Sequence, residues 1–195
     1  VIRETVDEMR RRVGPERTLY LAMGIGGAGL AAAAVLEALS RPNIVVVGAT
    51  FAQNRSAELS LQRDEQAPVG IDEAVDARCA GSAVTRIGQI PYDILRAGHK
   101  RGKLMLVNVP PEAIGRMLYQ DSLHETHEGI EATGMLGEAA FKAAKVDTNG
   151  VRVGFYTGGN PDEAKDTSLM EQYHNRPRHA HGNMYTGGSR TGSAA

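Results

Sequence analysis

A cluster of glycines near the start of the chain has the spacing of a phosphate-binding turn. Gly24, Gly26, Gly27 and Gly29 lie in the run Gly-Ile-Gly-Gly-Ala-Gly, which fits the pattern G-x-G-x-x-G. In such turns one glycine allows a tight bend, one lets the backbone approach a pyrophosphate, and one permits close helix–strand packing. The N–H groups that open the helix face the anion. The alternative interpretation is that these glycines only allow close packing in a core rich in small residues.

Two histidines are the candidates for acid–base chemistry. His124 and His127 lie in Leu-His-Glu-Thr-His-Glu, where i and i+3 spacing on a helix would place them on one face with Glu128. That arrangement suits proton transfer or metal binding. A solvated, charged helix surface explains the same pattern. No Cys or carboxylate spacing completes a metal site with the tail histidines between positions 174 and 181, so no metal is predicted.

The glycine run lies between two elements that would position it. Thr18 to Met23 is an apolar run typical of a strand, and Leu30 to Leu39 is rich in alanine, which favours a helix. Asn43 to Gly48 contains Ile-Val-Val-Val, a β-branched run typical of a strand covered on both faces. These segments predict a β-α-β unit, whose strands are parallel and whose connection is right-handed.

The same alternation continues along the chain. Further helices are predicted at Glu4–Arg12, Asp72–Arg78, Pro91–His99, Pro110–Leu118 and Gly134–Lys145, and further strands at Val84–Ile90, Lys103–Val109 and Val151–Tyr156. The segment from Tyr156 to Pro161 follows a strand and is either a second ligand loop or a plain turn. The pattern predicts an α/β fold: a Rossmann-like, mostly parallel sheet with helices on both faces, in a single domain over residues 1–181. Residues 182–195 are expected to form an extended C-terminal tail.

Two segments carry a resemblance to a known class of domain. The turn Gly24–Gly29 and the run 104–114 (Leu-Met-Leu-Val-Asn-Val-Pro-Pro-Glu-Ala-Ile) resemble the NAD(P)-binding Rossmann domains of dehydrogenases. The resemblance implies a dinucleotide on the turn, with Pro110 in a loop beside it. The strand Ile44–Val47 is not followed by the acidic residue that holds a ribose 2′-hydroxyl, whereas Arg55 is similar to what a 2′-phosphate needs. The resemblance therefore implies NADP as cofactor rather than NAD.

Three functions follow from these observations. The first is a nucleotide-cofactor-binding protein, most simply a small NADP-type oxidoreductase or reductase subunit. The second is a non-catalytic structural or regulatory subunit of a homo- or hetero-oligomeric assembly. The third is a mononucleotide or another phosphorylated ligand at the same turn, because helix N-termini hold any phosphate.

Composition limits the partners. A chain of 195 residues with 42% hydrophobic residues is long enough for one core of ordinary size. Its net charge of −1 provides no basic field for nucleic acid or for an anionic membrane. The single cysteine excludes an internal disulfide, which favours a cytoplasmic location. The Gly/Ser/Thr-rich tail predicts self-association or a larger complex, formed when the tail orders on a neighbouring subunit.

Overall fold

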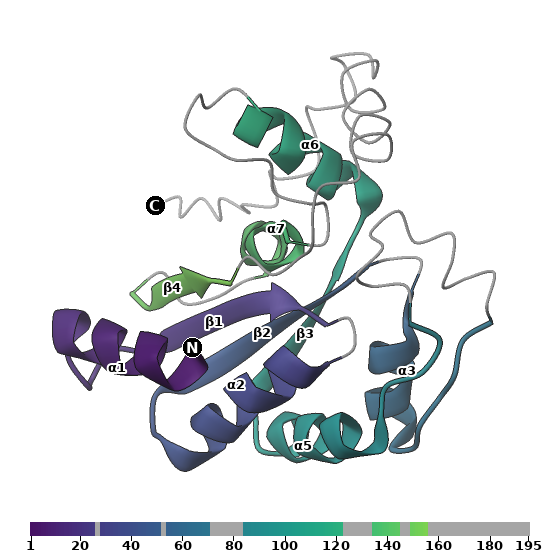
Figure 1. The fold of residues 1–195 in the computed structure, drawn as a ribbon, viewed down its shortest axis with the longest axis horizontal. Coiled ribbons are helices and arrows are strands. Elements are labelled where there is room, and N and C mark those ends of the chain that lie inside the picture. Colours follow the sequence, from purple (N-terminus) through teal and green to yellow (C-terminus); the bar gives the residue numbers. More distant parts are fainter. Residues whose placement is uncertain (26–27, 52–53, 71–83, 123–133, 145–148, 156–195) are drawn as a thin grey trace, which may run out of the picture.

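The computed structural model describes residues 1–25, 28–51, 54–70, 84–122, 134–144 and 149–155, and there helices alternate with strands (Figure 1). In chain order the elements are α1 (Ile2–Val13), β1 (Leu19–Gly24), α2 (Gly29–Ser40), β2 (Ile44–Phe51), α3 (Ser56–Arg63), α5 (Gln89–Lys100), β3 (Leu104–Val109), α6 (Pro111–Ser122), α7 (Leu136–Ala143) and β4 (Val151–Gly154). This alternation confirms the predicted α/β fold.

The four described strands form one parallel sheet in the order β3-β2-β1-β4. The register of β1 on β2 runs from Leu19 beside Ile44 to Gly24 beside Ala49. Every residue of β2 except Val45 is buried, as its β-branched sequence predicts for a strand covered on both faces. The predicted Rossmann-like parallel sheet is therefore confirmed.

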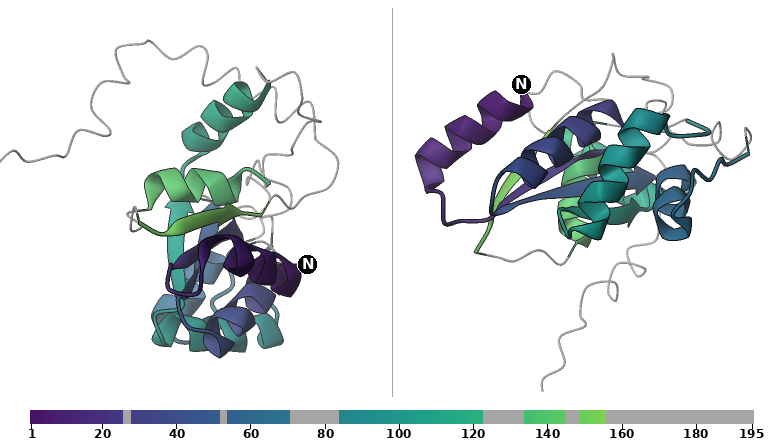
Figure 2. Two further views of the ribbon diagram at one scale, coloured as in Figure 1. Left: turned by 90° about the vertical axis from the view of Figure 1, so that its left-hand side faces the viewer. Right: turned by 90° about the horizontal axis from the view of Figure 1, so that it is seen from below.

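Helices cover both faces of the sheet and make three layers (Figure 2). The side chains of β1 alternate between the layers, because successive residues of a strand point to opposite faces. Leu21 belongs to the hydrophobic cluster that contains Val35 of α2 and Leu95 of α5, whereas Ala22 belongs to the cluster that contains Leu136 of α7. α1 packs beside α2 at the edge of the first layer.

Small residues bring the helices close to their neighbours. α2 is rich in alanine, and α5 presents Gly98 to it; a Cβ atom on Gly98 would lie 2.4 Å from Cγ1 of Val35. On the other face, a Cβ atom on Gly137 of α7 would lie 2.8 Å from the carbonyl oxygen of Ala22.

Within the described residues, no helix has both the length and the apolar character that crossing a bilayer requires.

Two sequence expectations differ from the structure. Residues 84–88 do not form the predicted strand, and α5 begins at Gln89, because Gly88 and Pro91 suit the start of a helix. The polar segment after β2 contains α3, which the sequence analysis did not predict; it buries Ala57 and Leu61 at i, i+4 spacing. The predicted helix Asp72–Arg78 lies outside the described residues.

Candidate functional site

The glycine turn connects the carboxyl end of β1 to the first turn of α2. β1 ends at Gly24, and the N–H of Ile25 donates a hydrogen bond to the carbonyl of Ala49, 2.8 Å away, so the chain stays attached to β2 as it leaves the sheet. α2 then begins at Gly29. Gly26 and Gly27 lie outside the described residues. The predicted strand–turn–helix context is therefore present.

The turn also lies where the order of the sheet reverses. From β1 the chain builds β2 and then β3 on one side, and it returns to add β4 on the other side of β1 (Figure 1). The N–H of Phe155, directly after β4, donates to the carbonyl of Ala22, 2.8 Å away. The chain therefore leaves two adjacent parallel strands at the same edge, after Gly24 and after Phe155. In open α/β sheets this switch point is where ligands bind.

The N-terminus of α2 has features that suit an anion. Its N-cap residue, Ala28, has a left-handed backbone with φ of 66° and provides no side-chain cap, and the first turn carries no acidic residue. The first N–H groups of a helix have no partner within the helix, and the helix dipole favours negative charge beside them. Gly29 is exposed, and a Cβ atom there would meet nothing within 4 Å. This helix end can therefore hold a phosphate or a carboxylate.

Two glycines outside the turn shape its surroundings, and the sequence analysis missed both. A Cβ atom on Gly48 of β2 would lie 2.4 Å from Cδ1 of Ile25, so the glycine makes room for the buried side chain that anchors the start of the turn. Gly137 lets the first turn of α7 contact the backbone of Ala22 and Met23. The signal for Gly48 was available, because a glycine within a β-branched strand marks a close approach.

Arg55 lies at the carboxyl end of β2, but its guanidinium is held by a neighbouring carboxylate. Its Nε and Nη2 atoms donate to Glu58 at 2.8 and 2.7 Å. This bidentate contact raises the pKa of Arg55 and lowers that of Glu58. Asn108 at the end of β3 lies 3.4 Å from the same carboxylate. The guanidinium is therefore engaged in an ion pair with a neighbouring residue at the surface.

The other predicted site residues are not brought to the turn by the described structure. Pro110 lies between β3 and α6, where its carbonyl accepts a hydrogen bond from Ala113 at 3.0 Å. β2 separates β3 from β1, which puts Pro110 about 10 Å from the turn in the plane of the sheet. His124 and His127 lie outside the described residues. Among the described residues, no group of three or more His, Cys, Asp or Glu side chains is placed to hold a metal ion.

Comparison with solved structures shows the fold that this chain shares. It is similar to the processed form of threonine deaminase isoform 2 from Solanum lycopersicum, with a TM-score of 0.63, 21% identity, and coverage of 85% of this chain and 46% of that one. For maize serine racemase the TM-score is 0.60 and the identity 18%, over 88% of this chain and 51% of that one. Diaminopropionate ammonia lyase from Escherichia coli, in complex with an aminoacrylate-PLP azomethine reaction intermediate, has a TM-score of 0.62 and 14% identity over 87% and 46%.

The chain thus spans about half the length of the solved structures that it resembles. No protein-family model and no curated protein sequence matches it. What these comparisons define is a class of fold: an α/β domain of the kind found in these deaminase, racemase and lyase structures.

The comparisons correct the functional reading of the sequence. The resemblance to NAD(P)-binding dehydrogenase domains is wrong, because the structural neighbours are a deaminase, a racemase and a lyase, the last crystallised with a PLP intermediate. The assignment as an NADP-type oxidoreductase is therefore wrong, and so is NADP as its cofactor. The physical reason is that a glycine turn at a helix N-terminus suits any phosphate group, so this motif by itself does not identify a dinucleotide.

Proposed function

We propose that this chain contributes the phosphate-binding part of an enzyme that uses pyridoxal phosphate (PLP) to transform amino acids. The observation that carries the proposal is the position of the glycine turn: it joins β1 to an uncapped helix N-terminus at the switch point of the sheet. The similarity to amino-acid deaminase, racemase and lyase structures supports it.

The residues around the turn fit the phosphate of this cofactor. The proposed donors are the backbone N–H groups that open α2, from Gly29 onward, together with the turn that precedes them. Ile25 and Gly48 hold the start of the turn against the sheet, which keeps these N–H groups in place. When bound, PLP acts as an electron sink for a carbanion of the amino acid. The contribution of this chain is to bind and orient the cofactor through its phosphate.

The described lysines all lie away from the turn. Lys103 donates to the carbonyls of Arg41 and Ile44 at the amino end of the sheet, Lys100 pairs with Asp64, and Lys142 lies on α7 beside Glu138. PLP enzymes attach the cofactor to a lysine. We place that lysine outside the described residues, and the phosphate contacts can therefore be tested separately from covalent attachment.

A single substitution at Gly29 tests the phosphate site. Gly29→Asp places a carboxylate where the phosphate is proposed to bind, and the open space around Gly29 accepts the new side chain. Acidic residues in the first turn stabilise helices, so we expect unchanged or slightly raised stability. PLP should raise the melting temperature of the unsubstituted protein, because a ligand bound only by the native state stabilises it. The shift should disappear in Gly29→Asp.

The matched control is Gly29→Asn, which adds a side chain of the same shape without the charge and should keep most of the shift. Pyridoxal, which lacks the phosphate, and NADP should produce no shift. Equal shifts in Gly29→Asp and Gly29→Asn would show that the phosphate is not at this helix end. If PLP does not change the melting temperature of the unsubstituted protein, this chain does not bind PLP.

The rival function, a non-catalytic structural or regulatory subunit, gains no support from the described residues. Self-association through residues 182–195 stays a separate proposal, because that segment lies outside the described residues.

A further inference from the structure

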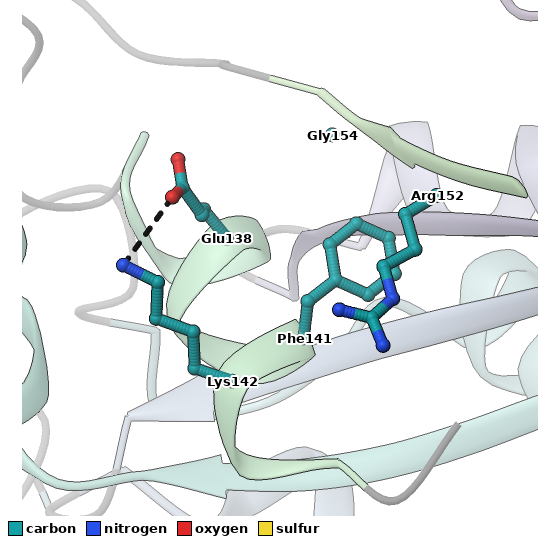
Figure 3. Close-up of a pocket in the computed structure, with 5 residues that line it drawn as sticks. All are labelled: Glu138, Phe141, Lys142, Arg152 and Gly154. Atoms are coloured by element: carbon teal, nitrogen blue, oxygen red, sulfur yellow. Dashed lines mark ion pairs between the residues drawn. The ribbon is translucent and has the colours of Figure 1, made fainter. Parts of the chain in front are cut away.

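A pocket of about 260 Å³ lies between α7 and β4, the strand at one end of the described sheet, and its lining combines charged and aromatic side chains (Figure 3). Glu138, Phe141 and Lys142 come from α7, and Arg152 and Gly154 come from β4. The pocket is on the face of the sheet that α7 covers, whereas the glycine turn leads into α2 on the opposite face. The proposed PLP contacts make no use of these side chains.

Arg152 is the principal charged group of this pocket. It is exposed, and its guanidinium has no hydrogen-bond or ion-pair partner within the described part of the chain. The other arginine at this end of β4, Arg17, is engaged, since its Nη2 donates to the carbonyl of Asn149 at 2.9 Å. A guanidinium presents parallel N–H donors whose geometry matches a carboxylate.

The remaining groups define what else a ligand must carry. Lys142 and Glu138 form an i,i+4 ion pair at 3.5 Å, with side chains 49% and 37% exposed, a kind of pair that contributes little to stability in water. Among the described residues that line the pocket, two cations and one carboxylate leave an excess of one positive charge. The Phe141 ring lies between Arg152 and the Lys142–Glu138 pair (Figure 3). The positive charge therefore favours an anion, and the part of the otherwise buried Phe141 ring that lines the pocket favours an apolar group beside it.

We propose that this pocket binds a small organic monocarboxylate, with its carboxylate on Arg152 and its apolar body on Phe141. The volume suits a small metabolite, since sites for drug-sized ligands occupy about 300–1,000 Å³. The ammonium group of Lys142 also attracts the carboxylate of the ligand, whereas the carboxylate of Glu138 repels it. The proposal is independent of PLP, because none of the four side chains belongs to the proposed phosphate site.

Isothermal titration of the purified protein with benzoate, without PLP and at low ionic strength, tests the proposal. We expect a dissociation constant in the millimolar range or below. Arg152→Gln should weaken binding at least tenfold, a loss of about 1.4 kcal/mol. Glu138→Gln should tighten binding about two- to fivefold, as expected when one repelling charge about 5 Å from the ligand is removed in a water-like dielectric. Opposite effects from these two variants cannot both arise from partial unfolding.

The controls separate this site from general anion binding. Arg101→Gln, at an exposed arginine beyond the end of α5, should leave the affinity for benzoate unchanged. Benzamide has the ring of benzoate but no negative charge, so it tests whether the carboxylate is needed. Inorganic phosphate is an anion without an apolar group, so it tests whether the ring is needed. Both should bind at least tenfold more weakly than benzoate. The proposal is overturned if benzoate does not bind, if Arg152→Gln binds it as well as the unsubstituted protein, or if benzamide or phosphate matches it.

Discussion

At the scale of single residues, Arg10 joins three segments at the amino end of the sheet. Its Nη1 atom donates to the carbonyls of Gly14, Pro15 and Arg17, and its Nη2 atom donates to those of Pro42 and Asn43, at distances from 2.6 to 3.3 Å. α1 is therefore connected to the loops that enter β1 and β2. A guanidinium can donate to this many acceptors because it has about five N–H groups spread over three nitrogen atoms in a plane, whereas an ammonium has three on a single atom.

We predict that Arg10→Lys lowers the free energy of unfolding by about 2 kcal/mol, the size of a hydrogen bond to a charged group. Urea denaturation followed by circular dichroism measures this change. Arg11→Lys is the matched control, since Arg11 lies next on the same helix and pairs only with the exposed Glu8. If Arg10→Lys lowers the free energy of unfolding no more than the control does, water must replace Arg10 as the hydrogen-bond donor to the five carbonyls without loss of stability.

At the scale of elements, an exposed carboxylate connects α3 to α5. Asp64 ends α3 in a left-handed conformation, and it accepts hydrogen bonds from Arg96 and, at 2.8 Å, from Lys100 of α5. Hydrogen bonding to Arg96, followed by that to Lys100, holds the pKa of Asp64 well below its usual value. A carboxyl group with a lowered pKa stabilises the fold when it is ionised.

The contribution of Asp64 should therefore depend on pH. It is present above the ordinary carboxyl pKa of 3.8 and is lost as the pH falls below that value. We predict that Asp64→Asn melts at a lower temperature than the unsubstituted protein at neutral pH, and that the difference shrinks steadily in acid. Calorimetry over this pH range measures it. Asp93→Asn, which alters a contact with Gln89 within α5, is the control, and it should lower the melting temperature less than Asp64→Asn does at neutral pH. A constant difference across the range would contradict the ion-pair account.

At the scale of the whole molecule, the boundary between the folded domain and its tail is a testable proposal. The composition of residues 182–195 cannot bury enough apolar surface to contribute to a core. Deleting these residues should therefore leave the midpoint of thermal unfolding unchanged. If the tail mediates self-association, the mass measured by light scattering should fall in the same variant. A lowered midpoint at unchanged mass would instead make the tail part of the folded unit.

Local sequence patterns were enough to predict the layered α/β architecture. The β-branched run Ile44–Val47 becomes β2, which is almost wholly buried, because continuous apolar strands need cover on both faces. The apolar run 104–107 becomes β3, which lies at one end of the described sheet, and its Met105, Leu106 and Val107 are only half-buried there. The alanine-rich segment after the glycine turn becomes α2. These assignments rest on local periodicity and on propensity, which act over a few neighbouring residues. α3 was missed for the same reason, since only two of its four buried residues, Ala57 and Leu61, are apolar, which is too weak a pattern to predict a helix.

The location of the candidate site and the choice of residues around it depend on long-range packing. The return of β4 to the free side of β1 creates the switch point, and that pairing joins residues more than a hundred positions apart. Arg55 has the right residue type near the end of β2, yet its guanidinium is bound by Glu58. The pocket that contains Arg152 exists only where α7 lies against β4. Such facts depend on long-range packing and on competition between partners, which residue types and spacing along the chain do not encode locally.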